Sequence, residues 1–121
     1  MAQSLRRVNA PLHLTQQDFD DRIAATGTPV IVDFYAPWCA PCHLLLPLLD
    51  QLANDCAGRV TFFKVNIVEE IALMERFDIS EVPTLLFFVD GEPRDAVFGF
   101  ASPRDMVARV EAFAAEAADS R

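Results

Sequence analysis

The sequence predicts an α/β fold in which a mixed five-stranded sheet is covered by helices on both faces. Strand-like and helix-like segments alternate through most of the chain, and one helix separates the two most apolar strand segments. The last two strand segments are joined by a short turn. A strand–helix–strand unit makes a right-handed parallel crossover, whereas a tight turn makes an antiparallel pair, so the sheet has to be mixed.

The first third of the chain predicts a short strand, a helix and a central strand. The segment LHLTQQDFDDRIAA, residues 12–25, begins as a strand, and Thr15 with Asp18 marks the helix start as a capping box. The segment PVIVDFY, residues 29–35, is too apolar for a strand with one exposed face. We therefore expect this strand at the centre of the sheet.

The middle of the chain predicts a long helix, a strand and a short helix. The long helix should run from about residue 39 to about 54, and VTFFKVN at 60–66 should be a second interior strand. EEIALMERF at 69–77 has the spacing of a short helix. The apolar side of that helix is predicted to consist of Ile71, Met74 and Phe77.

The last third predicts a hairpin and a closing helix. TLLFFV at 84–89 and DAVFGF at 95–100 are strands joined by a turn at DGEP. The helix at 102–118 has Ser102 at its N-cap and Pro103 at its first position. Its apolar stripe is formed by Met106, Val110, Phe113 and Ala117.

Length and charge limit the class of protein. A chain of 121 residues suits one domain, which we expect over 1–121 with a flexible arm at about 1–10 and a tail at about 117–121. A net charge of −8 argues against binding to nucleic acid or to an anionic membrane surface. No apolar run has the length of a membrane span, and no signal-like apolar segment follows the first arginines. We expect a cytoplasmic protein.

Two of the three cysteines stand close together in the segment WCAPC, where a strand gives way to a helix. This pair could be half of a metal site, a structural disulfide or a redox pair. Cys39 falls in the first helical turn, where the helix dipole lowers the pKa of a thiol, and Cys42 follows on the same side within disulfide reach. We expect Cys39 to be an exposed attacking sulfur and Cys42 a more buried resolving sulfur, with Trp38 shielding the loop.

A metal site is the weaker interpretation. Zinc would need two further ligands, and the remaining candidates, Cys56, His13 and His43, make no second close pair. We therefore expect no metal. Cys56 has two interpretations, a small buried hydrophobic residue or a regulatory or intermolecular disulfide partner. No role is assigned to His13.

Four motifs resemble the thioredoxin family in their order and spacing, from about residue 12 to about 115. They are VDFYAPWCAPC at 32–42, KVNI at 64–67, VPT at 82–84 and FGF at 98–100. The resemblance implies a thioredoxin fold with four helices, and a Cys39–Cys42 dithiol that reduces protein disulfides through a mixed disulfide. It also implies recharging by a thioredoxin reductase, a monomer, and no cofactor.

The resemblance assigns a catalytic role to Asp33, with Lys64 as its neighbour. By pattern alone, Asp33 is either a buried carboxylate or an exposed residue of an edge strand. In the family the matching aspartate lies beneath the cysteines and helps to remove the proton of the resolving thiol. On this basis we expect Asp33 to matter most at low pH, where that thiol most needs a base.

The resemblance also predicts a substrate-binding groove beside the cysteines. The bond before Pro83 should be cis and leave the backbone of Val82 free to pair with substrate, and a side chain at Gly99 should crowd the groove. The groove residues are Trp38, Ala40, Pro41, Val82, Pro83, Gly99 and Phe100.

The chain departs from the family pattern around the cysteines. The departures are Tyr35, Ala40, His43, Glu81 and Phe100. We expect His43 and Glu81 to modulate the site, Glu81 by opposing the Cys39 thiolate. Two other functions stay open on the same fold, a thiol oxidase or isomerase and a binding module without turnover.

Overall fold

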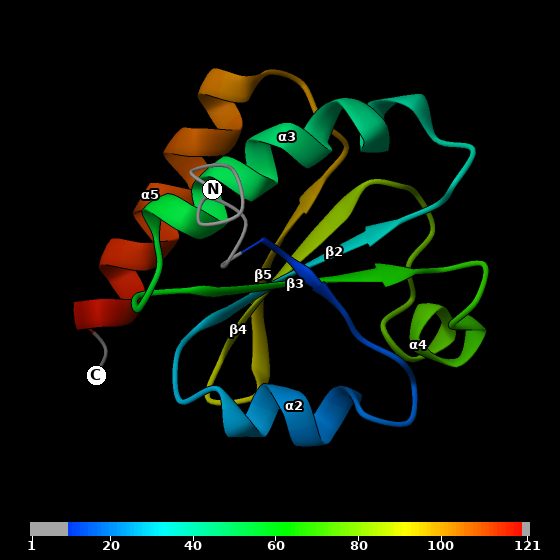
Figure 1. Ribbon diagram of the computed structural model, residues 1–121, viewed down its shortest axis with the longest axis horizontal. Coiled ribbons are helices and arrows are strands. Elements are labelled where there is room, and N and C mark those ends of the chain that lie inside the picture. The colour runs from blue at the N-terminus through cyan, green and yellow to red at the C-terminus, as the bar shows by residue number, and fades with distance from the viewer. Residues whose placement is uncertain (1–9, 120–121) are drawn as a thin grey trace, which may run out of the picture.

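A five-stranded mixed sheet organises residues 10–119, the part of the chain that this computed structural model describes (Figure 1). The strands lie in the order β1-β3-β2-β4-β5. Pairing is parallel between β1 and β3 and between β2 and β3, and antiparallel between β2 and β4 and between β4 and β5. The bounds are β1 Leu12–His13, β2 Val30–Tyr35, β3 Thr61–Asn66, β4 Thr84–Val89 and β5 Glu92–Phe98. The predicted order of elements and the central place of β2 are confirmed.

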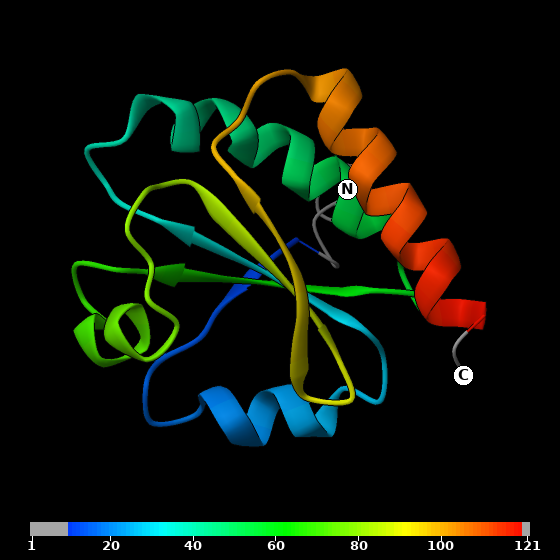
Figure 2. The ribbon, with the colours of Figure 1, turned by 180° about the vertical axis from the view of Figure 1, so that it is seen from behind.

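Helices cover both faces of the sheet, as predicted. They are α2 Phe19–Ala25, α3 Ala40–Asp55, α4 Ile71–Arg76 and α5 Pro103–Asp119. Figures 1 and 2 show α3 and α5 together on one face and α2 on the other. None of the helices within residues 10–119 combines the length and apolar character needed to cross a bilayer.

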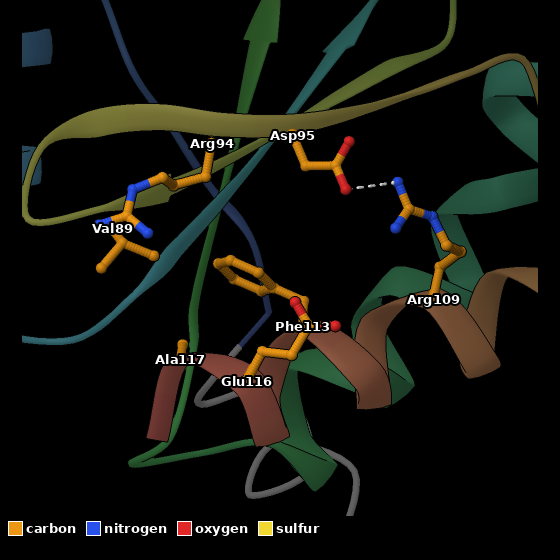
Figure 3. A pocket seen from close by; sticks show the side chains of 7 residues that line it. All are labelled: Val89, Arg94, Asp95, Arg109, Phe113, Glu116 and Ala117. Carbon is orange, nitrogen blue, oxygen red and sulfur yellow. Dashed lines mark ion pairs between the residues drawn. The ribbon is translucent and has the colours of Figure 1, made fainter. Parts of the chain in front are cut away.

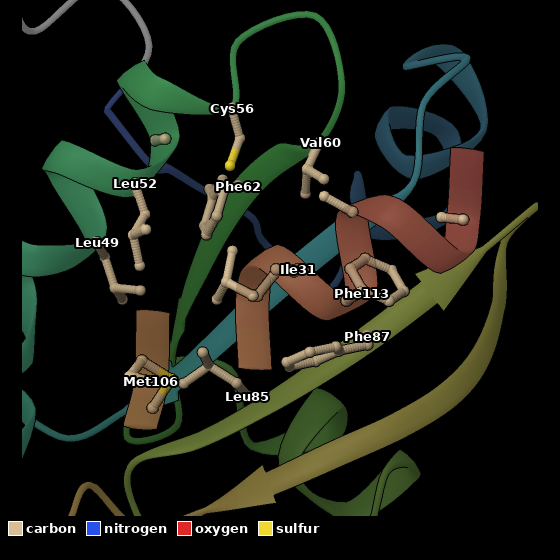
Figure 4. Close-up of a cluster of buried hydrophobic side chains, with 14 of the residues drawn as sticks. Ile31, Leu49, Leu52, Cys56, Val60, Phe62, Leu85, Phe87, Met106 and Phe113 are labelled. Carbon is tan, nitrogen blue, oxygen red and sulfur yellow. The ribbon is translucent and has the colours of Figure 1, made fainter. Parts of the chain in front are cut away.

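Two hydrophobic clusters lie on the two faces of the sheet. The larger one joins α3 and α5 to the side chains that point toward them, among them Ile31 and Phe87 (Figure 4). The smaller one joins α2 and α4 to Val32 and Phe34. Successive residues of β2 alternate between the clusters because strand side chains point to opposite faces. A strand that contributes side chains to both clusters has to be apolar on both faces, which explains the sequence of β2.

The predicted caps form. Thr15 and Asp18 exchange hydrogen bonds of 2.8 and 3.2 Å as a capping box does, although residues 16–18 form a turn and α2 begins only at Phe19. The Ser102 hydroxyl accepts a bond of 3.1 Å from the backbone N–H of Asp105 at the start of α5. The predicted stripe of α5 is buried throughout.

The prediction for α4 is wrong in one residue, and the bounds of β5 and α5 differ from those predicted. Leu73 is the buried residue of α4, whereas Ile71 is 53% exposed, because in a six-residue helix several apolar spacings compete. Strand β5 spans Glu92–Phe98 where 95–100 was predicted, and it begins early since the turn needs only Asp90 and Gly91. Helix α5 continues through 117–119, where a tail was expected. The expected arm lies outside the described residues except for Ala10.

Candidate redox site

The cysteine pair lies where β2 leads into α3. Cys39 and Cys42 form a disulfide, with their Cα atoms 5.3 Å apart, and Cys39 is the N-cap residue of α3. The Cys39 Sγ accepts a hydrogen bond of 3.2 Å from the backbone N–H of Cys42. The unpaired N–H groups and partial positive charge of a helix start favour a thiolate here once the disulfide is reduced.

Both cysteines are buried, which corrects the expectation of an exposed attacking sulfur. Cys39 is 5% exposed and Cys42 is 1% exposed, so the predicted order of exposure is retained. They form a small cluster with Ala36, against which Tyr35, Ile67 and Val82 pack. Three segments that are far apart in the sequence therefore meet at the disulfide and cover it.

The loop before the disulfide is tied to the first turn of α3 by His43. The His43 Nε2 donates a hydrogen bond of 2.7 Å to the carbonyl oxygen of Pro37. Trp38 lies between these two residues in the chain and is 73% exposed, so it does not shield the loop. Ala40 and Pro41 are exposed as well. These three residues form exposed surface next to the cysteines in the chain.

Val82 and Pro83 approach the cysteines from the start of β4. The peptide bond between them is cis, as the resemblance implies, and the Val82 side chain packs on the cysteine cluster. The backbone N–H of Gly99 donates a bond of 2.8 Å to the Pro83 carbonyl. The Thr84 hydroxyl donates a bond of 2.7 Å to the carbonyl of Glu81. These bonds fix the segment beside the disulfide.

Gly99 and Phe100 follow β5 beside the Val82–Pro83 segment. A Cβ on Gly99 would meet no atom within 4 Å, so contacts within the chain do not require glycine, and the expected crowding of the substrate groove stays a prediction. Its φ of +79° requires glycine, because this left-handed conformation is strained for residues with a Cβ. Phe100 is half-buried and packs against the larger core cluster. The exposed aromatic residue in this segment is Phe98, at the end of β5.

Asp33 is a buried carboxyl in the middle of the sheet. It is 1% exposed on the central strand β2, which excludes the edge-strand interpretation, and it pairs in register with Lys64 of β3. Neither of its carboxylate oxygens has a hydrogen-bond partner among the described residues. Burial raises the pKa of Asp33 to about 7, and the positive charge of Lys64 offsets part of the rise. Asp33 therefore changes protonation near neutral pH, as a proton acceptor for a thiol should.

A contact between Tyr35 and His13 was missed in the sequence. The phenol oxygen of Tyr35 lies 2.5 Å from His13 Nε2, and the Tyr35 ring packs on the cysteine cluster. Burial and the charge of Lys64 lower the pKa of His13, while Glu69 and Glu70 act against them. No spacing rule pairs residues that are 22 positions apart, so only the register of β1 against β3 could have revealed this contact.

The only tyrosine of the chain offers a direct test of this environment. Burial raises the pKa of Tyr35, and the charges of Glu69 and Asp33 raise it further. We expect a tyrosinate absorbance titration of the folded protein to show a midpoint above the usual value of about 10. Glu69→Gln should lower that midpoint, whereas Glu92→Gln, at the far end of the sheet, should not. A wild-type midpoint at or below the usual value would contradict the described packing.

Cys56 lies apart from the redox pair, in the larger core cluster. Its Sγ contacts a Glu111 carboxylate oxygen at 3.9 Å and a guanidinium nitrogen of Arg59 at 3.7 Å. Burial and the neighbouring Glu111 raise the pKa of this thiol. Full burial favours the interpretation as a core residue over that as a disulfide partner. Within residues 10–119, no three His, Cys, Asp or Glu side chains are grouped as metal ligands.

A separate hollow lies between β5 and α5 (Figure 3). Asp95 and Arg109 form an ion pair of 3.0 Å beside it. Its lining residues are Val89, Arg94, Asp95, Arg109, Phe113, Glu116 and Ala117. It contains no cysteine, and its two arginines are matched by two carboxylates, so it adds nothing to the redox chemistry.

Comparisons with known proteins all lead to one family. The chain matches the thioredoxin family model over residues 10–112. It is 38% identical to thioredoxin of Staphylococcus saprophyticus, over 84% of this chain and 94% of that protein. It is 35% identical to chloroplastic thioredoxin M-type of Pisum sativum, over 88% of this chain. Among solved structures, a single-residue mutant of thioredoxin from Halobacterium salinarum NRC-1 has a TM-score of 0.77 and 31% identity, covering 88% of this chain and 92% of that one.

The fold and a cysteine pair at bonding distance define the class of thiol–disulfide oxidoreductases. The chain belongs to the thioredoxin family. It spans 62% of the pea relative and 54% of chloroplastic thioredoxin M4 of Arabidopsis thaliana.

Proposed function

We propose that this protein reduces disulfides of other proteins with the Cys39–Cys42 dithiol. The observation that carries the proposal is the disulfide at the start of α3, with the Cys39 sulfur placed to accept a hydrogen bond from the first helical turn. A hydrogen bond to sulfur favours the thiolate, which is the nucleophile in disulfide exchange. A structural disulfide would have no use for such activation.

In the proposed cycle, the Cys39 thiolate attacks one sulfur of the substrate disulfide. A mixed disulfide forms, and the other substrate sulfur leaves as a thiolate. The Cys42 thiol then gives its proton to Asp33 and attacks the Cys39 sulfur. This step forms the Cys39–Cys42 disulfide and releases the second substrate thiol. Two electrons pass to the substrate, and an external dithiol, such as that of a thioredoxin reductase, returns them to the protein.

Lys64 has an electrostatic role in this cycle. Lys64 lies opposite Asp33 in the register of β3 against β2. Its positive charge stabilises the ionised carboxylate, whereas burial destabilises it. Without that charge the pKa of Asp33 would rise further, and less of the base would be available at neutral pH. Lys64 thereby keeps Asp33 able to receive the proton of Cys42.

The substrate binds beside the cysteines in this proposal. Trp38, Ala40 and Pro41 supply exposed surface on one side, and the Val82–Pro83 segment supplies the other. We infer that an extended substrate strand pairs with the backbone of Val82, while Pro83, which lacks an N–H, adds no donor of its own. Gly99 adjoins this segment through its bond to Pro83.

We further propose a monomer that works in the cytoplasm and receives electrons from a thioredoxin reductase. A dithiol reductant needs a reducing compartment, which supports this location. Plant relatives are named as chloroplastic, and that compartment is the alternative. Cell fractionation with detection of the protein would separate the two.

Reduction of insulin disulfides by a small dithiol tests the proposed activity. We expect the protein to accelerate insulin reduction many-fold over the dithiol alone, and we expect a Cys39→Ser, Cys42→Ser double variant to give the uncatalysed rate. A folded wild-type protein that adds nothing to that rate would contradict the proposal and favour a binding role.

A further inference from the structure

We propose that the cysteine end of this protein docks substrates whose disulfide is flanked by lysine or arginine. The inference rests on the proposed function and names its substrate class. Strands β2 and β3 end on the side of the sheet where β4 begins. The loop to α3, the loop to α4 and the segment before β4 therefore lie together at this end of the molecule (Figure 1).

The first observation is an apolar surface at this end. Trp38 is 73% exposed, and Val68 and Ile71 are both 53% exposed. Ile67, directly before Val68, packs on the cysteine cluster. Large exposed apolar side chains grouped around a reactive bond indicate a surface that a partner covers. They supply contact area to any substrate and do not select among substrates.

The second observation is a set of carboxylates around that surface. Glu69 lies two residues after Ile67, and Glu81 lies directly before Val82, and both of those apolar residues contact the cysteine cluster. Glu69 and Glu81 are exposed. The charge of Glu69 also raises the pKa of Tyr35, whose ring packs on the same cluster. Its field thus reaches the immediate surroundings of the disulfide.

The third observation is that nothing in these segments offsets the negative charge. Arg76 is the single lysine or arginine between residues 67 and 83, and its guanidinium forms bonds of 3.0 and 2.8 Å to Asp20. Segments 36–42 and 99–102, which complete this end, contain no charged residue. Lys64 of β3 is a nearby cation, but it is paired in register with the Asp33 carboxyl. The exposed carboxylates Glu69 and Glu81 therefore make the approach to the disulfide net negative.

Charge complementarity then selects the occupant. A disulfide flanked by lysine or arginine is attracted to Glu69 and Glu81, whereas one flanked by aspartate or glutamate is repelled. The effect acts mainly on the association rate and weakens as salt screens exposed charges. A pair of exposed charges changes a rate or affinity by about two- to fivefold.

Matched peptides test this inference. Three peptides, each closed by one disulfide, differ only in flanking residues, which are lysine, glutamate or serine. The pre-reduced protein is mixed with each peptide in excess, and the second-order rate of its oxidation is followed by Trp38 fluorescence. We expect the lysine peptide to react at least about fivefold faster than the glutamate peptide at low salt, and we expect the ratio to fall toward one in high salt.

Two variants and one control locate the charges. Glu69→Gln and Glu81→Gln should each reduce the preference for the lysine peptide. Glu92→Gln removes the same charge at the opposite end of the sheet, where β5 begins, and should leave the preference unchanged. Equal rates for the lysine and glutamate peptides, or a preference that survives in both site variants, would overturn the inference. Failure of the serine peptide to react would instead speak against the proposed function.

Discussion

A Cys42→Ser protein should accumulate as mixed disulfides with its substrates and lose turnover. Its Cys39 still attacks, because the helix start that activates this sulfur is unchanged. The serine hydroxyl cannot attack the mixed disulfide, so the partner stays attached. Non-reducing electrophoresis after incubation with a disulfide substrate should show the adduct, and mass spectrometry should locate it on Cys39.

A Cys39→Ser protein is the matched control, and it should form no such adduct. Cys42 is less exposed than Cys39, at 1% against 5%, and it lies within α3 after that N-cap residue, so it should react far more slowly with a substrate sulfur. Cys56 is buried as well and should stay unmodified. Wild-type turnover in the Cys42→Ser protein, or adducts on Cys42 in the Cys39→Ser protein, would reverse the proposed roles.

Replacing Asp33 with asparagine should make the oxidised protein more stable against unfolding and should slow its turnover. Burial raises the pKa of Asp33 from 3.8 to about 7, so folding penalises the charged carboxylate. A group with a raised folded-state pKa destabilises the fold above its unfolded pKa, and the penalty is complete above the folded one. The stability of the wild type should therefore fall between about pH 4 and pH 7. Asparagine carries no charge, so the variant should not show this loss.

The gain in stability should reach about 2–4 kcal/mol near pH 8 and vanish near pH 4. The lower end of this range allows for the cost of burying the asparagine amide with few hydrogen-bond partners. Urea unfolding at the two pH values measures the difference. A variant that is less stable near pH 8 would show that Asp33 is a satisfied structural group, held by Lys64.

The loss of activity in Asp33→Asn has its own pH dependence. The sequence suggests the largest loss at low pH, but a pKa of about 7 reverses that expectation. Below this value the wild-type carboxyl is protonated and accepts no proton, so wild type and variant should converge. We expect the largest difference in activity between about pH 7 and about pH 8.5. Above the upper value the thiol ionises without help from a base.

Periodic patterns in the sequence predicted most of the fold. The stripe of α5 recurs from Met106 to Ala117, and β2 is apolar on both faces, so each had one plausible place. The short α4 was misjudged because six residues do not fix a helix face. The cysteines were placed correctly at a strand end and a helix start, since both boundaries have local signals.

The surroundings of the cysteines were harder to predict because they depend on contacts between distant segments. The burial of Cys39 arises from Ile67 and Val82, which come from two other loops. The partner of His13 is Tyr35, on a strand that is not even its direct neighbour in the sheet. Phe100 carries no local sign that it packs into the core. These features follow from tertiary packing, which no single segment specifies.

The two edge strands of the sheet determine how readily an unfolded chain can pair with this protein. An exposed strand of an unfolded chain can pair with any open edge of a sheet. Here one edge, β1, is two residues long, and the other, β5, begins with Glu92, Pro93, Arg94 and Asp95. Proline lacks an N–H for a new ladder, and charged side chains oppose stacking against apolar strands. Neither edge of the sheet, as described over residues 10–119, therefore offers a long open strand on which an unfolded chain could stack.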